Sequence, residues 1–186
     1  MSKVYVFMAD GTEEVEALMV VDLLRRAGVA VTTVSVMERE EIVSSHNIGI
    51  RTDEMFGASD YADGDMLVLP GGMPGTTHLK EHEGLQKILK KYEKDGKYLA
   101  AICAAPSVLG SNGLLSGKQA ICYPGFEEQL DGAEIVNKNV VHDGQFITSK
   151  GLGTAIDFSL TLIEILAGSE AAANVARGVQ YQASII

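Results

Sequence analysis

Cys103 is the first residue whose type and position suggest chemistry. The thiol ends the apolar run "YLAAIC" and precedes "AAPSVLG", so a strand ends and a helix can begin there. Ala104 and Ala105 leave room for a tight turn, and Pro106 suits a first helical turn, where a missing amide donor costs nothing. This pattern is typical of a nucleophile elbow with cysteine in place of serine. We interpret Cys103 as a nucleophile, whereas Cys122, inside "AICYP", is interpreted as a small buried hydrophobe.

Glu16 is the acidic residue best suited to orient such a nucleophile or to move its proton. It stands at helical spacing from three apolar residues, so its carboxyl heads an otherwise apolar stripe: Val20, Leu23 and Ala27. Burial there would raise the pKa of the carboxyl, and a protonated carboxyl can donate a hydrogen bond to a thiolate. The alternative is a position at the solvated edge of the stripe. Glu13 and Glu14 are sufficiently explained as first-turn carboxylates opposite the helix dipole.

Gly71 and Gly72 are candidates for stabilising a negatively charged oxygen. They follow the core strand of "LVLPGGMPG", where glycine lets backbone amides approach a substrate closely. Tight-turn geometry alone would also explain two adjacent glycines.

Metal and nucleotide sites find no support in the sequence. The histidines stand in polar contexts typical of a solvated surface, and no pair has metal-ligand spacing: His46, His78, His82 and His142. The two cysteines form no CxxC motif. "GLGTAI" lacks the third glycine of the dinucleotide fingerprint, because Ile156 stands in its place. We therefore expect no metal and no cofactor.

The elements that must position these residues alternate between short apolar runs and amphipathic stretches. This alternation predicts a three-layer α/β/α sandwich with a mostly parallel, flavodoxin-like sheet (class I glutamine amidotransferase-like), as one domain over residues 1–186. Residues 38–64 are expected to form a short hairpin or an excursion at a sheet edge, and Asp143-Gly144 is a strong hairpin signal. Strands are expected at residues 3–9, 29–36, 65–72, 98–103 and 118–124, and helices at 12–28, 84–97, 153–168 and 169–181.

Composition narrows the possible partners and the compartment. The chain has 186 residues, a net charge of -10 and no basic cluster larger than a pair, so nucleic acid is an improbable ligand. No apolar run approaches the length of a membrane span, and the N-terminus is not typical of a signal peptide. With two cysteines and no disulfide framework, a cytoplasmic location is expected. The helix at residues 12–28 is apolar around most of its circumference, which predicts a homodimer.

Four motifs in order and with similar spacing resemble the DJ-1/ThiJ/PfpI superfamily, in particular its bacterial ThiJ-like branch: "ADGTEEVEAL", "DMLVLPGGMPG", "AAICAAPSVL" and "ITSKGLGTAIDFSL". The resemblance implies that Cys103 is an acidic, oxidisable thiol on the elbow and that Glu16 is hydrogen-bonded to it. It also implies that the amides of Gly72 and Ala104 form the oxyanion site. Ala104 stands where PfpI-type peptidases carry histidine, so the resemblance argues against peptidase activity.

Tyr123 is a second departure from the superfamily pattern. Many relatives carry histidine at this place, so a nearby general base is in doubt. A phenol with a pKa near 10 is a poor base at neutral pH, but Tyr123 could orient a substrate oxygen or close the pocket.

Two functions of different classes follow from the resemblance. In the first, Cys103 attacks glyoxal or methylglyoxal, or their adducts with amines and thiols, in a glutathione-independent glyoxalase or deglycase reaction through a hemithioacetal. In the second, the protein is a non-enzymatic oxidative-stress sensor or redox-regulated chaperone that uses oxidation of Cys103. The expected ligands are accordingly small reactive aldehydes or glycated adducts.

Overall fold

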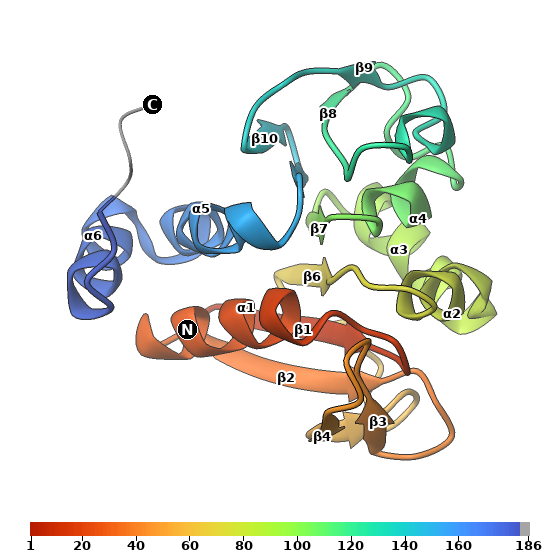
Figure 1. The fold of residues 1–186 in the computed structure, drawn as a ribbon, viewed down its shortest axis with the longest axis horizontal. Coiled ribbons are helices and arrows are strands. Elements are labelled where there is room, and N and C mark those ends of the chain that lie inside the picture. Colours follow the sequence, from red (N-terminus) through yellow and green to blue (C-terminus); the bar gives the residue numbers. More distant parts are fainter. Residues whose placement is uncertain (183–186) are drawn as a thin grey trace.

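A mostly parallel sheet forms the centre of the protein in a computed structural model, which describes residues 1–182 (Figure 1). Its strands run in the order β10-β11-β7-β6-β1-β2-β5. Neighbouring strands are parallel except for the β10 and β11 pair at one edge. The strand bounds are β1 Lys3–Met8, β2 Ala30–Ser35, β5 Glu54–Met55, β6 Met66–Leu69, β7 Tyr98–Ile102, β10 Val140–Asp143 and β11 Phe146–Ser149.

Helices cover both faces of this sheet. One face packs on α1 (Glu14–Arg26), α5 (Ala155–Ala167) and α6 (Ser169–Gly178). The other face packs on α2 (Gly75–Glu81), α3 (Glu83–Lys94) and α4 (Pro106–Gly110). Each face has its own apolar core, because side chains of a buried strand alternate between the two faces. The predicted three-layer sandwich is confirmed.

Helix α1 forms as its sequence predicts. The Glu13 side chain caps its start by accepting a hydrogen bond from the Glu16 backbone N–H, and Arg25 and Arg26 lie in its last turn. Gly28 follows the helix with φ +77°, a conformation that favours glycine. Val20 and Leu23 of the predicted stripe are buried, as is Glu16 at its head, so the solvated-edge alternative for Glu16 is wrong.

Both predicted hairpins are present. Strands β3 (Glu41–Val43) and β4 (Gly49–Arg51) form a separate two-stranded sheet, so the segment 38–64 makes the expected excursion. Strands β10 and β11 pair Asp143 with Phe146, which makes Gly144 and Gln145 the two turn residues. The turn therefore lies one residue beyond the predicted Asp143-Gly144, with Gly144 at φ +62°.

One prediction of local structure is wrong, and one helix was not predicted. Residues 118–124 are not a core strand, because only β8 (Gln119–Ala120) is extended and it pairs with β9 (Glu134–Ile135) outside the central sheet. The backbone N–H of Ile121 instead donates to the Thr148 hydroxyl at 3.0 Å. Helix α2 was not expected, since "PGGMPG" was interpreted as a turn and no side chain caps the helix. Short 3-10 helices complete the connections at Glu127–Gln129 and Leu152–Thr154.

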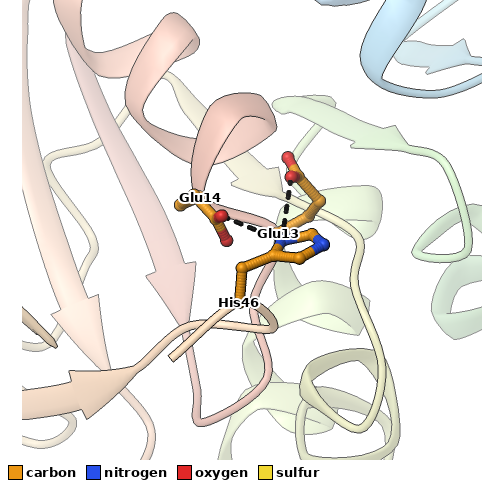
Figure 2. Close-up of side chains that lie close together, drawn as sticks. All are labelled: Glu13, Glu14 and His46. Atoms are coloured by element: carbon orange, nitrogen blue, oxygen red, sulfur yellow. Dashed lines mark ion pairs between the residues drawn. The ribbon is translucent and has the colours of Figure 1, made fainter. Parts of the chain in front are cut away.

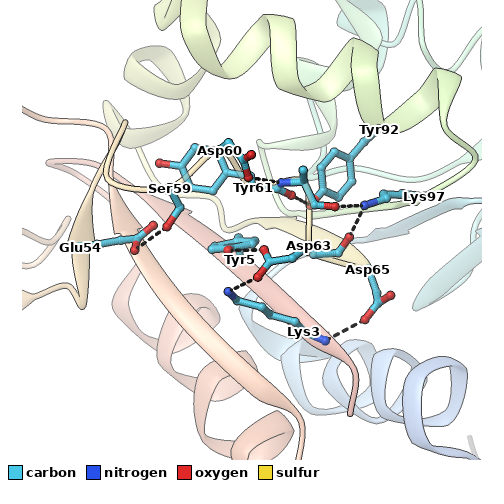
Figure 3. Close-up of polar contacts among 12 residues, drawn as sticks. Lys3, Tyr5, Glu54, Ser59, Asp60, Tyr61, Asp63, Asp65, Tyr92 and Lys97 are labelled. Carbon is cyan, nitrogen blue, oxygen red and sulfur yellow. Dashed lines mark hydrogen bonds and ion pairs between the residues drawn. The ribbon is translucent and has the colours of Figure 1, made fainter.

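The amino ends of the parallel strands are tied together by polar side chains, which Figure 3 shows. The Lys3 ammonium and the Tyr5 hydroxyl each lie 2.7 Å from the Asp63 carboxylate. The Tyr92 hydroxyl donates to the Tyr61 carbonyl oxygen at 2.5 Å. These contacts hold the loop before β6 against β1 and α3. No helix within residues 1–182 is long and apolar enough to cross a membrane.

Candidate functional site

Cys103 occupies the first position after β7, at the carboxyl end of the sheet. Its backbone N–H donates to Ser149 of β11 at 2.9 Å, and its carbonyl oxygen accepts from the Tyr123 N–H at 2.7 Å. These contacts hold Cys103 at φ +65°, a left-handed conformation that costs a non-glycine residue free energy. The chain then turns into α4, with Pro106 in its first turn. This is the conformation that the nucleophile-elbow prediction requires.

Backbone N–H groups surround the Cys103 sulfur. Those of Gly72 and Ala104 lie close enough to lower the pKa of the thiol, so both residues of the predicted oxyanion site lie near it. Gly72 has φ +92°, and a Cβ on it would lie 2.3 Å from the backbone nitrogen of Glu13. Only glycine fits there, which explains why its amide can come so close to the sulfur.

Gly71 has the same requirement for a different reason. A Cβ on Gly71 would lie 2.6 Å from Cys103 Cβ and 2.7 Å from Glu16 Oε2. Its N–H donates to Glu16 Oε2 at 2.9 Å. The glycine pair thus brings the end of β6 into contact with both candidate catalytic side chains.

Glu16 reaches the thiol from the first turn of α1. Its side chain accepts from the Gly71 backbone N–H at 2.9 Å, and the Cys103 thiol and the Leu152 backbone N–H lie close enough to lower its pKa. Only 1% of the residue is exposed to solvent. Burial is the main reason that the pKa of this carboxyl rises to about 7. The prediction of a partly protonated carboxyl beside Cys103 therefore agrees with the environment of Glu16.

Cys103 and Glu16 titrate as a pair. Burial first, and then the neighbouring Glu16 charge, raise the pKa of the Cys103 thiol to about 12, whereas the Ala104 and Gly72 amides oppose this rise. While Glu16 is ionised, the thiol keeps its proton. When the carboxyl holds the proton instead, the repulsion disappears and it can donate to a thiolate. Between these two pKa values the pair holds one proton, which either group can carry. The raised pKa of the thiol disagrees with the acidic thiol that the resemblance implies, because burial and the Glu16 charge outweigh the effect of the two amides.

Sequence analysis did not identify residues 151–152, which also border the site. A Cβ on Gly151 would lie 3.8 Å from both Cys103 Sγ and Glu16 Oε1, so this glycine borders the thiol and the carboxyl. Leu152, the next residue, supplies the second amide to Glu16. The signal was available, since "SKGLG" follows a buried strand just as "LPGG" does.

Tyr123 lies beside Gly151. It is half exposed, and its ring approaches to 3.4 Å from the Cβ position of Gly151. Together with five neighbours it lines an open pocket of about 280 Å³ that also includes Gly151: Pro124, Lys150, Leu152, Gly153 and Thr154. The position fits the predicted role of closing a pocket or orienting a substrate oxygen, and that role stays a prediction.

Cys122 is buried in the core, as predicted, and both cysteines are free.

The histidines do not all follow the prediction of a solvated surface. His46 and His142 are exposed. His82 is half buried, and its ring accepts a hydrogen bond from the Leu85 N–H at 3.0 Å, which caps α3. Its ring also packs 4.3 Å from that of Phe56, and burial lowers its pKa. For His82 the prediction is wrong, because the cap of α3 needs an acceptor at this position.

Comparisons with known proteins agree with this architecture. "Protein DJ-1 homolog B" of Arabidopsis thaliana is 44% identical over 177 residues, which are 93% of this chain and 40% of that protein. "Glutathione-independent glyoxalase DJR-1.2" of Caenorhabditis elegans is 31% identical and covers 87% of this chain and 86% of its own. The solved structure of oxidised Toxoplasma gondii DJ-1 has a TM-score of 0.94 at 36% identity, with 97% of this chain and 99% of that chain covered.

This chain spans less than half the length of the Arabidopsis protein that it matches. The sequence motifs nevertheless extend over most of the chain, and residues 2–165 match the family description "DJ-1/PfpI family". With the strained thiol, its carboxyl partner and the three-layer fold in place, the chain belongs to the DJ-1/PfpI family.

Proposed function

We propose that the protein is a cysteine-dependent, glutathione-independent glyoxalase that acts on glyoxal and methylglyoxal, or a deglycase acting on their adducts. The observation that carries the proposal is the buried Glu16 carboxyl beside the Cys103 thiol, with the amides of Gly72 and Ala104 near the same sulfur. One relative bears the name of a glutathione-independent glyoxalase, which supports the same chemistry.

The reaction uses the proton that the pair shares. Transfer of that proton to Glu16 produces a thiolate, which adds to the aldehyde carbon of methylglyoxal and forms a carbon–sulfur bond. Glu16 protonates the resulting oxyanion, while nearby amides stabilise its charge, to give a hemithioacetal. A proton then moves from the former aldehyde carbon to the neighbouring carbonyl carbon, and the hydroxyl proton of the hemithioacetal moves to the former ketone oxygen, which gives a thioester of lactate. Water hydrolyses this thioester and restores the thiol. One carbon is oxidised as its neighbour is reduced, so no external oxidant is needed.

The decisive test is steady-state turnover of glyoxal and methylglyoxal by the wild type, Cys103→Ser and Cys122→Ser. We expect Cys103→Ser to lose at least about a hundredfold in kcat/KM, because serine at neutral pH is a far weaker nucleophile. Cys122→Ser is the matched control and should stay within about twofold, since Cys122 lies in the core away from the site. Undiminished turnover in Cys103→Ser would contradict the proposal.

A redox sensor is the second candidate function. Cys103 is partly exposed and has amide donors that can stabilise an oxidised sulfur. One solved relative is described as oxidised, which supports oxidation of that protein. This function predicts negligible aldehyde turnover by the wild type, together with peroxide oxidation at Cys103 before Cys122 in peptide mapping. The same assay therefore separates the two candidates.

The homodimer prediction also stays a proposal, and α1 is its proposed interface. Val15 and Leu18 are 38% and 42% exposed, and together with Met19 they form an apolar patch on this helix. Light scattering should give the mass of a dimer for the wild type and that of a monomer for Leu18→Glu. A cytoplasmic location likewise remains a prediction.

A further inference from the structure

Three side chains outside the thiol site point toward one another where α1 begins. Glu13 and Glu14 come from the start of the helix, and His46 comes from the turn between β3 and β4 (Figure 2). His46 Nδ1 lies 2.8 Å from Glu14 Oε1 and 3.9 Å from Glu13 Oε1. One potential ligand atom from each residue lies within 4.8 Å of the other two.

Both residues are buried, and Glu13 also caps the start of α1. Glu13 and Glu14 are only 9% and 8% exposed. Glu13 Oε2 accepts from the Glu16 N–H, whereas Glu13 Oε1 is accessible to solvent and faces His46 Nδ1 at 3.9 Å. His46 is also the only basic side chain of that range within ion-pair distance of either carboxylate. Two buried carboxylates thus converge on a single imidazole, an arrangement in which a cation would be stabilised.

The backbone fixes the histidine opposite the carboxylates. The Ser45 N–H donates to the Thr12 carbonyl at 2.9 Å, and the Gly11 N–H donates to the Val43 carbonyl at 2.7 Å. The Ser45 hydroxyl lies 3.3 Å from Glu14 Oε2, where it can orient the carboxylate from outside. The side chain of His46 is 69% exposed, so its ring can rotate without disturbing the core.

We propose that Glu13, Glu14 and His46 form a binding site for a divalent transition-metal ion of the zinc class, with its remaining coordination position open to water. Tetrahedral zinc with bonds of about 2.1 Å places neighbouring ligand atoms about 3.4 Å apart. The distances from His46 Nδ1, 2.8 Å and 3.9 Å, lie on either side of this value, so a small rotation of the ring closes the site. The imidazole favours zinc over magnesium or calcium, which prefer oxygen ligands.

The site needs only one chain. All three ligands belong to a single protomer, although Glu14 also borders the apolar patch of α1. The site adjoins the proposed catalytic pair, because Glu13 accepts from the Glu16 N–H, but neither Cys103 nor Glu16 is a ligand. Metal binding can therefore be tested whether or not the protein is a glyoxalase.

The experiment is isothermal titration with Zn²⁺ of the full chain carrying Cys103→Ser, which removes the competing thiol. We expect one ion per chain with micromolar or tighter affinity. His46→Ala and Glu14→Gln on this background should each weaken binding at least about tenfold, because even the loss of an outer partner of a metal ligand costs 10–100-fold. His142→Ala is the matched control, since His142 is also exposed and sits in β10; its affinity should stay within about twofold of the parent.

The visible spectrum of bound Co²⁺ provides a second measurement. Four-coordinate cobalt should give intense absorption bands in the parent and in His142→Ala, but not in His46→Ala. Circular dichroism checks that every variant is folded. Absence of Zn²⁺ binding by the parent, or equal affinity in the parent and a folded His46→Ala, would overturn the proposal.

Discussion

Titratable side chains have different environments at the two ends of the central sheet. At the amino ends of the strands, Asp63 accepts from both Lys3 and Tyr5, and the Tyr92 hydroxyl donates to a backbone carbonyl (Figure 3). At the carboxyl ends, the Glu16 carboxyl and the Cys103 thiol share one proton between two buried groups. The first arrangement satisfies each group, whereas the second leaves a proton free to move.

This difference shows where the fold accepts a cost in stability. A positive φ at Cys103 and a buried carboxyl at Glu16 both raise the free energy of the folded state. The same strands β1, β6 and β7 connect both ends, so satisfied contacts at one end can offset the strain at the other. A site of this kind is expected where chemistry rather than stability determines the residues.

The largest expected effect concerns the proton at the carboxyl end. Glu16→Gln keeps a hydrogen-bond donor but removes the transferable proton, so methylglyoxal turnover should fall by about 10² to 10⁴. Glu16→Leu removes both, so the thiolate should also lose a hydrogen-bond donor and react more slowly with iodoacetamide near pH 6 than it does in the Gln variant. The measurements are steady-state kinetics and the pH dependence of thiol labelling, with peptide mapping.

Cys122 provides an internal control for the labelling. Its thiol has a pKa raised to about 11, mainly by burial, and does not contact Glu16. Its labelling should therefore be slow and unchanged in both variants. Full glyoxalase turnover in Glu16→Gln would show that Glu16 does not shuttle the proton, even if Cys103 is the nucleophile.

Local sequence signals predicted the parts of this site that lie within single segments. Cys103 follows a recognisable strand and precedes Pro106, and Glu16 stands in register with a helical stripe, so both could be identified before the fold was known. The mostly parallel sheet and the three layers followed from alternating apolar and amphipathic segments. The family motifs added Gly72 and Ala104.

Contacts between distant segments could not be predicted in the same way. The Leu152 amide reaches Glu16 only because β11 pairs with β7, and His46 reaches Glu13 only because the β3 and β4 hairpin folds over the start of α1. "KQAICYP" has the composition of a core strand, yet its Ile121 amide bonds to a side chain rather than to a neighbouring strand. In each case a contact between distant segments determined the structure, and local propensity alone could not predict it.

The second prediction measures the free-energy cost of the buried carboxyl. The pKa of Glu16 rises from 4.5 to about 7 on folding, so the protonated form is favoured in the native state. Protonated Glu16 therefore adds to the free energy of unfolding. This contribution is fully present below pH 4.5 and is lost as the pH rises to about 7. At 1.36 kcal/mol per pKa unit, the loss amounts to about 3 kcal/mol.

Glu16→Gln lacks this titration. Its free energy of unfolding relative to that of the wild type should therefore increase by about 3 kcal/mol between pH 4.5 and pH 7. Urea unfolding at intervals over this range measures the difference. If the difference in the free energy of unfolding between the two proteins does not change with pH, burial does not raise the pKa of Glu16.

The smallest expected effect is at the amino end, where Tyr92→Phe removes one buried hydrogen bond. The Tyr61 carbonyl then loses its 2.5 Å donor but keeps the Gly64 N–H at 3.3 Å, so the free energy of unfolding should fall by about 0.5–1.5 kcal/mol. Burial raises the pKa of Tyr92, so its phenol stays neutral and this loss should be independent of pH between 4.5 and 7, in contrast to Glu16→Gln. Methylglyoxal turnover should remain within about twofold of the wild type, because the five residues of β7 separate this end of the sheet from Cys103 by about 16 Å. Denaturant unfolding and kinetics on the same preparation test both statements. A large loss of turnover in a folded Tyr92→Phe would show that the two ends are coupled and that the division between a stabilising end and a reactive end is wrong.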